Sequence, residues 1–384
     1  MHRVTKLAAA AAVTALTLAG LTACGDDGGD DSSSGGGGGG DLTPVTLQLQ
    51  WVTQAQFAGY IEALAQGYYE DQGLDVTIVP AGTDTVPQLT VDDGGSADYA
   101  IAWTPKALQS REQGANITNV GQVFQRSGTL QISFKDAGIT SVDDLKGKNV
   151  GSWGYGNEFE LYAAMTKAGL DPSSDVNVVQ QAFDMNGFLN GDIDAAQAMI
   201  YNEYAQVLEA ENPDTGELYT PDDLNVLNWN DEGTAMLQDA IWANTTKLQD
   251  PDYQDTTVAF LTASYQGWIA CADDPEQCRD DVVAAGSQLG ASHQLWQVNE
   301  VNQLIWPSPD GIGMMDQTAW DQTVQVALTT QNGDGDTVIT KEPDADAYTT
   351  DYTEQALANL EDMGLDTTGS DYQPIDVTLE EGGK

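Results

Sequence analysis

Residues 45–79 read VTLQLQWVTQAQFAGYIEALAQGYYEDQGLDVTIV, and the spacing of apolar side chains changes twice along this stretch. The pattern at residues 45–49 predicts a β-strand, and residues 76–79 predict a second one. Between them, residues 57–66 predict a helix whose apolar face is formed by Phe57, Tyr60, Ile61 and Leu64. The stretch therefore predicts a strand–helix–strand unit.

The alternation of strands and helices continues along the chain. Further strands are predicted at residues 99–102, 120–123 and 130–134, and successive helices at residues 255–272, 275–289 and 292–305. This rhythm predicts an α/β fold whose sheets are covered by helices, followed by a helical C-terminal region. About 340 residues follow position 41, which is roughly the length of two domains.

The N-terminus has the features of an export signal. A positive start is followed by an apolar run over residues 7–20, which is too short to span a membrane. The run ends in LTACG at residues 21–25, which resembles the lipobox of bacterial lipoproteins. That resemblance implies that residues 1–23 are a signal peptide and that Cys24 becomes a lipidated N-terminus. An ordinary signal peptide with a chance cysteine is the alternative.

The segment after Cys24, GDDGGDDSSSGGGGGGD at residues 25–41, has almost no apolar side chain to bury. Its composition predicts a flexible tether with a reach of about 20–25 Å. Residues 24–41 therefore predict an extracytoplasmic protein that lipidated Cys24 anchors to the outer face of the cytoplasmic membrane, in an oxidising space.

Two further cysteines, Cys271 and Cys278, flank the sequence ADDPEQ. In an oxidising space they predict a disulfide, whose short loop stabilises the fold by about 2 kcal/mol. Two free thiols are the alternative. No metal site and no cofactor are predicted, because His293 is the one histidine after Cys24 and the sequence contains no Cys/His cluster.

The formal net charge is −47 at pH 7. This charge argues against nucleic-acid binding as the main role, because phosphate contacts need a basic face. The acidic residues are dispersed along the chain, which indicates a solvated surface rather than one acidic site.

Five stretches are similar to substrate-binding proteins of ABC importers: residues 50–82, DYAIAW at 98–103, SWGYGNEFE at 152–160, AMIYNEY at 198–204 and WQVNEVNQLIWP at 296–307. The branch that they resemble includes binders of alkanesulfonates, taurine and nitrate, of thiamine pyrimidine precursors and of riboflavin. Thiamine pyrimidine synthases use the same fold. The first loop looks closest to the riboflavin and pyrimidine types.

The resemblance implies a bilobal periplasmic-binding-protein fold of type II with two connecting strands. These strands are expected near residues 130–135 and 236–244. Lobe 1 is expected over residues 42–132 and lobe 2 over residues 133–239, after which residues 240–384 return to lobe 1 with the C-terminal helices. Ligands of open α/β sheets sit beyond the carboxyl ends of the strands.

Candidate ligand-binding residues begin in the first loop. Trp51 ends the first strand, and Gln54 and Gln56 precede the helix that holds Tyr60. Glutamine amides can match the donors and acceptors of a neutral heterocycle, and local capping is the alternative for both. Trp103, at a later strand end, is a stacking candidate, with core packing as its alternative.

The loop at 152–160 holds the next candidates. Trp153 and Tyr155 alternate with glycines, which let the backbone approach a ligand or adopt positive φ. The rings are predicted to stack on a flat ligand, and a ring in the core is the alternative. Asn157 and Glu158 are further candidates, and Asn157 with Glu160 fits a helix N-cap and its capping-box partner.

The stretch at 198–204 ends an apolar strand with Tyr201 and Glu203. In pyrimidine binders of the resembled family a glutamate near this position pairs with the ligand's amino group, and the resemblance carries that role to Glu203. A charge at a helix N-terminus is the alternative. Asp184 is a second acceptor candidate, with a local cap as its alternative.

The arginines Arg111, Arg126 and Arg279 lie outside the cleft motifs. The site therefore suits a neutral, planar, nitrogen-rich ligand better than a small anion. The predicted function is a monomeric, non-enzymatic receptor that closes on riboflavin or a thiamine pyrimidine precursor and delivers it to an ABC permease.

Two alternatives remain. A thiamine pyrimidine synthase-like enzyme would, as the resemblance implies, use a cysteine-rich iron motif and an internal histidine as substrate, but the sequence has no CCCFC-like run. A binder of alkanesulfonate, taurine or nitrate would need a cleft with free helix N-termini and few stacked rings.

Overall fold

The computed structural model of the chain describes residues 42–384. The predicted signal peptide, lipidated Cys24 and tether lie outside the described residues. The strands are β1 (Thr43–Gln48), β2 (Leu74–Val79), β3 (Tyr99–Trp103), β4 (Ile117–Gly121), β5 (Thr129–Phe134), β6 (Asn149–Ser152), β7 (Asn177–Gln180), β8 (Ala196–Met199), β9 (Leu224–Asn228) and β10 (Asp239–Asn244). The helices are α1 (Ala58–Ala65), α2 (Tyr68–Asp71), α3 (Thr104–Glu112), α4 (Phe159–Lys167), α5 (Asn186–Leu189), α6 (Glu203–Leu208), α7 (Trp229–Glu232), α8 (Pro251–Asp273), α9 (Pro275–Ala284), α10 (Ala291–Ile305), α11 (Gln317–Thr329) and α12 (Asp351–Asp362).

The predicted α/β fold with a helical C-terminal region is confirmed, with the ends of several elements shifted. The largest sheet has the strand order β2-β1-β3-β10-β4. In it β1 runs parallel to β2 and β3, whereas β10 runs antiparallel to β3 and β4. All of β3 is buried, as expected for a central strand that is covered on both faces. We call this sheet and its helices lobe 1.

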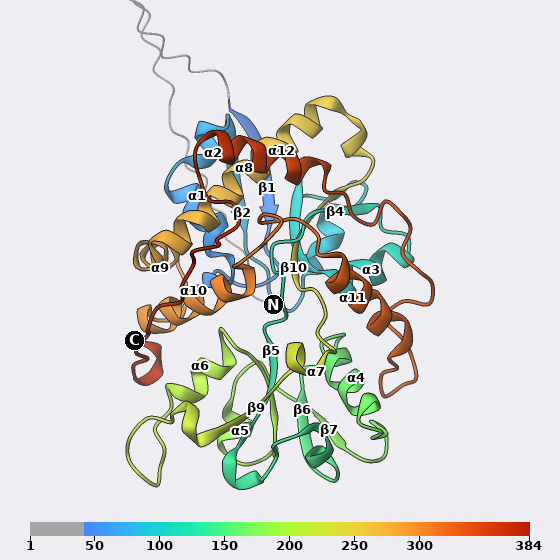
Figure 1. Ribbon diagram of the computed structural model, residues 1–384, viewed down its shortest axis with the longest axis vertical. Helices are drawn as coiled ribbons and strands as arrows, with labels where there is room; N and C mark the ends of the chain where they lie inside the picture. Colours follow the sequence, from blue (N-terminus) through green and yellow to red (C-terminus); the bar gives the residue numbers. More distant parts are fainter. Residues whose placement is uncertain (1–41) are drawn as a thin grey trace, which may run out of the picture. The chain divides into compact units, whose positions relative to one another are not determined.

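The remaining strands form lobe 2 together with α4, α5, α6 and α7. They make a three-stranded sheet of order β8-β5-β9 and a two-stranded sheet of β6 and β7. A parallel bridge between Val150 and Ala195 joins β6 to the segment before β8. Figure 1 shows lobe 2 below the five-stranded sheet of lobe 1.

The chain crosses between the two sets of strands twice. It leaves lobe 1 after β4 and enters lobe 2 at β5, and it leaves after β9 and returns at β10. The crossing segments are residues 122–128 and 233–238, and the second follows α7. The strands expected at the crossings, β5 and β10, are thus the first strands after each crossing. The lobe limits at residues 132 and 239 stay predictions.

Local sequence explains where the C-terminal helices begin. The Asp250 side chain accepts a hydrogen bond from the Asp252 backbone N–H at the start of α8, and Pro251 occupies the first turn. The Asp274 side chain caps α9 in the same way, with Pro275 next to it. An aspartate cap followed by proline is favourable because the cap satisfies a free N–H and proline has none to lose.

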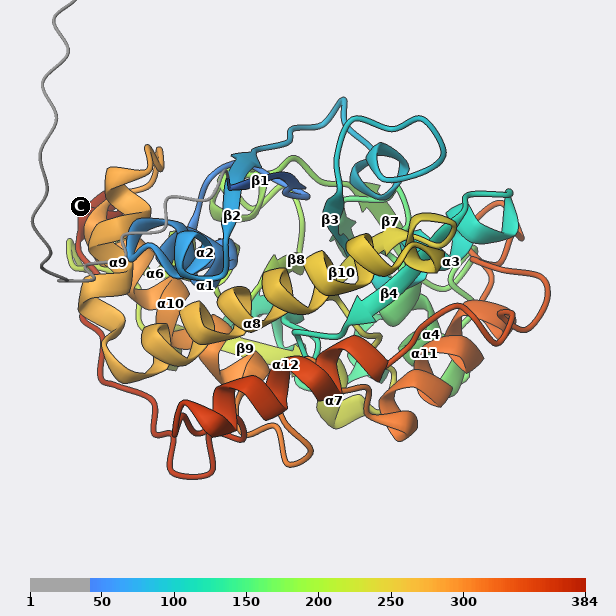
Figure 2. The same ribbon diagram turned by 90° about the horizontal axis from the view of Figure 1, so that it is seen from above.

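Helix α8 packs closely on α1, and Figure 2 shows α8 between α1 and α12. The close crossing depends on two glycines. A Cβ atom at Gly59 would overlap the Trp268 ring, and a Cβ atom at Gly267 would overlap the Gly59 carbonyl oxygen. The sequence spacing of α1 and α8 does not by itself indicate this contact, since it depends on the crossing point of two distant helices.

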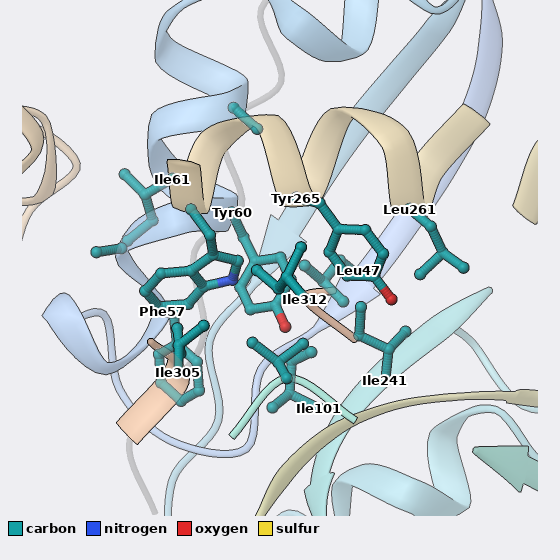
Figure 3. Packing of buried hydrophobic residues seen from close by; sticks show 14 of the residues in the cluster. Leu47, Phe57, Tyr60, Ile61, Ile101, Ile241, Leu261, Tyr265, Ile305 and Ile312 are labelled. Atoms are coloured by element: carbon teal, nitrogen blue, oxygen red, sulfur yellow. The ribbon is translucent and has the colours of Figure 1, made fainter. Parts of the chain in front are cut away.

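Tyr60, a predicted ligand residue, lies in the apolar core below this crossing. Figure 3 shows its ring among the side chains of Phe57, Ile305 and Ile312. The ring also packs edge-on against Trp268, with centroids 5.7 Å apart. The Tyr60 hydroxyl is buried and has no hydrogen-bond partner. The structure therefore assigns most of this side chain to packing.

Cys271 of α8 and Cys278 of α9 are disulfide-bonded, with Cα atoms 5.1 Å apart. The buried Glu62 carboxyl lies against them, and burial, helped by Asp281, raises the pKa of Glu62 to about 8. Within residues 42–384, Glu62 and the two sulfurs are the one group with metal-ligand spacing, and both sulfurs belong to the disulfide. No helix over the same residues is both long and apolar enough to cross a membrane.

Candidate functional site

The site lies at one edge of the five-stranded sheet. β1 and β3 end at this edge, and β10 begins there, because Asp239 of β10 pairs with Trp103 of β3. Loops that follow strands gather at the carboxyl ends of a parallel pair, which is where α/β proteins hold ligands. The loops after β6 and β7 of lobe 2 face the same edge, because Phe183 of the β7 loop contacts both Trp51 of the β1 loop and Trp153 of the β6 loop.

Three aromatic rings from both lobes meet at this edge. Trp51 follows β1, Trp153 follows β6 and Phe183 follows β7. The Phe183 ring centroid lies 5.2 Å from that of Trp51 and 6.4 Å from that of Trp153, the latter nearly parallel at 20°. Trp153 is buried, Trp51 is half-buried and Phe183 is 46% exposed. Such spacings are typical of interacting rings. We call these three residues the aromatic cluster.

The Gln197 side chain of β8 holds the loop that carries Trp153. Its Oε1 atom accepts hydrogen bonds from the Trp153 N–H and the Ser152 hydroxyl, both at 3.0 Å. Its Nε2 atom donates to the Asn157 carbonyl oxygen at 2.6 Å. These bonds cross the loop from one end to the other. These bonds fix the backbone of Trp153 within lobe 2, whereas its ring joins a buried cluster made mostly of lobe 1 residues.

Tyr155, at the tip of this loop, is 83% exposed and has a φ of 54°. It is the non-glycine residue with positive φ within residues 42–384, and Gly154 and Gly156 beside it also have positive φ. A tyrosine in the left-handed region costs of order 1–3 kcal/mol. The loop thus holds the ring outward into solvent, and its role in binding stays a prediction.

The side chains of Asn157 and Glu158 form hydrogen bonds within the loop itself. The predicted capping box is wrong. The Asn157 Nδ2 donates to the Gly154 carbonyl oxygen at 2.7 Å, and the Glu158 Oε2 accepts from the Gly156 N–H at 2.9 Å. Helix α4 begins at Phe159, with Glu158 as an N-cap whose side chain does not cap it. The tight loop shifts the helix start, so that Glu160 is the second residue of the helix and not the third, and no capping box forms.

Glu160 instead reaches the second crossing. Its Oε1 atom accepts from the Met236 backbone N–H at 2.6 Å, and the carboxyl is buried. Nearby, the Gln238 Nε2 donates to the hydroxyls of Ser127 and Thr129 in and after the first crossing. Burial raises the pKa of Glu160 to about 7, although hydrogen bonds from the Met236 N–H and from the Ser127 and Thr129 hydroxyls lower it. One ionisable group therefore sits where both crossings meet.

This position predicts a pH effect on stability. Because the folded pKa of Glu160 is above the unfolded value of 4.5, the folded state holds the extra proton and loses stability as pH rises from about 4.5 to about 7. Between pH 5.5 and 8, the wild type is expected to lose about 1–3 kcal/mol more free energy of unfolding than Glu160→Gln. Urea unfolding at both pH values measures this difference.

The exposed Glu361 of α12 supplies the control. Glu361→Gln is expected to follow the wild type within about 0.5 kcal/mol at both pH values, as surface substitutions usually do. If Glu160→Gln follows the wild type just as closely, the buried carboxyl does not control the pH dependence.

A second buried carboxyl, Asp239, ends a chain of amides from the first loop. Gln50 donates to Asp239 Oδ1 and Gln56 donates to Asp239 Oδ2, each at 2.9 Å. Gln54 donates in turn to Gln56 Oε1 at 2.8 Å. Burial raises the pKa of Asp239 to about 7, while the Gln56 amide, the Trp103 indole and Lys106 lower it. The predicted glutamines are thus joined to a residue that the sequence did not single out.

Trp103 stands beside this carboxyl. Its indole Nε1 is buried and stands close enough to the Asp239 carboxyl to lower that group's pKa, but within residues 42–384 it makes no hydrogen bond of normal length. The Lys106 Nζ lies 4.9 Å from the ring centroid, and burial lowers the pKa of Lys106 to about 8, opposed by Glu158 and Asp239. A small pocket with a free volume of about 10 Å³ opens next to Trp103 and is also lined by Asn157, Phe159, Glu160, Met236, Leu237 and Gln238. It adjoins both lobes and the second crossing.

The remaining candidates are placed as follows. Tyr201 is buried, with its ring edge-on to Phe124 of the first crossing at 6.3 Å. Glu203 is buried at the start of α6 and accepts from the Met199 N–H and the Asn202 side chain, both at 2.9 Å. Burial raises the pKa of Glu203 to about 7. Asp184 is exposed, and its side chain accepts a hydrogen bond from the Asn186 N–H, as a local cap does.

A family model described as NMT1/THI5 like matches residues 54–278, which is more than half of the chain. The chain belongs to the NMT1/THI5-like family. Among solved structures, the periplasmic aliphatic sulphonate binding protein SsuA from Escherichia coli aligns with a TM-score of 0.54 at 16% identity. The alignment covers 87% of this chain and 94% of that chain, and it confirms the bilobal periplasmic-binding-protein fold.

Two relatives in the NMT1/THI5-like family are matched over most of their length. The riboflavin-binding protein RibY of Chloroflexus aurantiacus is 24% identical over 291 residues, or 73% of this chain and 79% of that protein. The formylaminopyrimidine-binding protein of Halalkalibacterium halodurans is 22% identical over 291 residues, or 74% of this chain and 84% of that protein. Relatives named 4-amino-5-hydroxymethyl-2-methylpyrimidine phosphate synthase match at most 39% of this chain.

Several residues of this NMT1/THI5-like site escaped the sequence reasoning. Asp239 stands among apolar residues of a strand, and Phe183 is a single ring in a polar loop. For Lys106 the available signal was a cation three residues after the strand-end Trp103. A strand-end carboxyl beside a predicted crossing was the available signal for Asp239, whereas Phe183 had none.

His293 lies outside the aromatic cluster of this NMT1/THI5-like chain. His293 of α10 is buried, with Nδ1 at 2.7 Å from Glu209 Oε1 and Nε2 at 3.0 Å from Asn202 Oδ1. Asn202 in turn donates to Glu203. Both ring nitrogens are therefore engaged in joining α10 to α6.

Proposed function

We propose that this protein is an extracytoplasmic solute-binding protein that captures a planar heteroaromatic ligand between its lobes and supplies it to an ABC permease. The aromatic cluster carries this proposal. Its rings come from loops of both lobes, so a flat ligand that stacks on them contacts both lobes at once. Each such stack contributes about 1–3 kcal/mol of binding free energy. Binding that prefers the closed arrangement drives the lobes together.

Riboflavin is our first ligand, and a thiamine pyrimidine precursor is the second. The indole N–H groups of Trp103 and Trp153 are both buried without a hydrogen-bond partner. Buried donors of this kind need an acceptor, and the carbonyl oxygens and ring nitrogens of an isoalloxazine supply several. The names of RibY and of the formylaminopyrimidine-binding protein agree with these two ligand types.

The location follows from the N-terminal sequence. Lipidation at Cys24 and the tether over residues 25–41 would hold a monomeric receptor near the outer face of the cytoplasmic membrane. That placement brings the loaded receptor to its permease.

Neither alternative gains support from the site. For a pyrimidine synthase, the substrate histidine would have to reach the ligand, but His293 is buried on α10 with both nitrogens engaged. For an anion binder, Arg111 pairs with Asp346 and Arg279 with Asp280, while Arg126 donates to backbone carbonyl oxygens that include that of Pro307. Within residues 42–384, Lys106 is the cation near the site, and the negative charges of Glu158 and Asp239 already balance its positive charge.

A fluorescence titration of riboflavin with the purified protein tests the proposal. Saturable quenching at a 1:1 ratio is expected, because stacking on tryptophan quenches the flavin. Free tryptophan at the same concentration serves as the control. If folded protein neither quenches riboflavin nor gains melting temperature with riboflavin or 4-amino-5-hydroxymethyl-2-methylpyrimidine, the heteroaromatic ligand class is ruled out.

A further inference from the structure

The Asp239 carboxyl is 1% exposed and takes no part in an ion pair within residues 42–384. Buried carboxyl groups are rare unless they are paired, because desolvation of the charge is costly. The hydrogen-bond partners of this carboxyl are two neutral amides, from Gln50 and Gln56 of the first loop, and the Lys106 charge acts on the carboxyl only from beyond ion-pair distance. A fold that needed only packing at this position would do better with an apolar side chain. The carboxyl therefore calls for a functional explanation.

The orientation of the two amides is set by their other contacts. Gln50 Oε1 accepts the Trp103 backbone N–H at 3.1 Å, so its NH₂ group must face Asp239. Gln56 Oε1 accepts from Gln54, so its NH₂ group also faces Asp239. Each carboxylate oxygen has a lone pair that can accept a second hydrogen bond. Asp239 is thus held in place as an acceptor with unused capacity.

An unused donor stands next to this acceptor. Trp103 is opposite Asp239 in the β3–β10 pairing, and its side chain is 8% exposed. The indole N–H lies near enough to Asp239 to lower the pKa of that carboxyl, but within residues 42–384 it reaches hydrogen-bond distance of no acceptor, and Trp103 lines the pocket beside the second crossing. An unpaired buried donor costs about 1–3 kcal/mol unless a ligand satisfies it. Acceptor and donor together match a ligand edge that presents an N–H group next to an acceptor.

We propose that Asp239 determines ligand specificity by accepting an N–H hydrogen bond from the heterocycle, while Trp103 donates to the neighbouring carbonyl oxygen or ring nitrogen. This inference rests on the proposed function and narrows it. The ligand class is a planar heterocycle with an N–H group adjacent to an acceptor. The imide edge of riboflavin has this arrangement, and so does a 4-aminopyrimidine, in which the amino group stands beside a ring nitrogen.

The test compares riboflavin with 3-methylriboflavin, which has lost the imide N–H but keeps the stacking surface. Wild-type protein is expected to bind riboflavin at least about tenfold more tightly, because methylation leaves the buried carboxyl without its partner. Asp239→Ala is expected to weaken riboflavin binding at least about tenfold and to reduce the preference over 3-methylriboflavin to less than about twofold. Fluorescence quenching measures all four affinities.

Glu62→Gln is the matched control, since Glu62 is also a buried carboxyl but lies against the disulfide on α1. Its affinities are expected to equal those of the wild type. Equal binding of riboflavin and 3-methylriboflavin by the wild type overturns the role of Asp239, even if Asp239→Ala does not fold, and leaves the proposed function standing.

A second experiment tests an aminopyrimidine, which presents the same N–H group beside an acceptor. If riboflavin does not bind, calorimetry with 4-amino-5-hydroxymethyl-2-methylpyrimidine and its 4-dimethylamino counterpart repeats the comparison. A loss of at least about tenfold on dimethylation supports Asp239, and equal affinities overturn its role. Binding of neither riboflavin nor the aminopyrimidine overturns the proposed function itself.

Discussion

Replacing Trp51 by alanine is expected to weaken riboflavin binding by about 10- to 100-fold, because one stacking surface contributes about 1–3 kcal/mol and each 1.4 kcal/mol is a factor of ten. Trp51 suits this test better than Trp153, since Trp51 is half-buried whereas Trp153 is buried in the core. The loss should appear in the riboflavin titration as a higher dissociation constant at unchanged stoichiometry.

Trp320 provides the matched tryptophan outside the site. It lies on α11, where its ring packs on Tyr348 with centroids 4.7 Å apart. Trp320→Ala is expected to lower stability but to leave riboflavin affinity within about twofold in the folded protein. If Trp51→Ala also keeps wild-type affinity, the aromatic cluster does not bind the flavin.

Gly267→Ala is expected to lower the free energy of unfolding by about 3 kcal/mol or more, through overpacking between α8 and α1. A Cβ atom there would overlap the Gly59 carbonyl oxygen and stand 2.9 Å from the Ala63 nitrogen. Backbone atoms cannot rotate away as a side chain can, so the helices must separate. At about 2–4 °C per kcal/mol, the melting temperature should fall by about 6–12 °C.

Gly187→Ala is the matched control for this substitution. Gly187 is also helical, in α5, but a Cβ atom there would meet nothing within 4 Å. Alanine is the better helix former by about 0.8–1 kcal/mol, so stability should stay the same or rise. Equal melting temperatures for the two variants would contradict the proposed close contact of α1 and α8.

Much of the fold can be predicted from the sequence because its signals are local. The apolar run of β3 and the Asp-Pro starts of α8 and α9 depend on residues within one turn or one strand. The capping box predicted for Asn157 and Glu160 used the same kind of local signal and is wrong. There the loop over residues 154–157 uses its own hydrogen bonds, and Glu160 finds a partner 76 residues away.

In the candidate site, too, some residues can be identified from the sequence and others only from the tertiary structure. Trp51, Trp103 and Trp153 could be selected because aromatic residues at strand ends are visible in the sequence. Their neighbours could not, since Phe183 gains its place only when the β7 loop faces the β1 loop of the other lobe. For Tyr60 the local pattern was the better guide, since the apolar face predicted for α1 includes it and its ring does point into the core.

Local pattern thus establishes the α/β class, the succession of strands and helices and the strand-end aromatics, since these depend on side chains a few positions apart. Which of these side chains meet depends on the crossing of the chain between lobes. Asp239 lies 189 residues from Gln50 and 183 residues from Gln56, and no local spacing relates them. Only the antiparallel insertion of β10 beside β3 brings a carboxyl to the first loop and leaves the Trp103 indole N–H unpaired beside it.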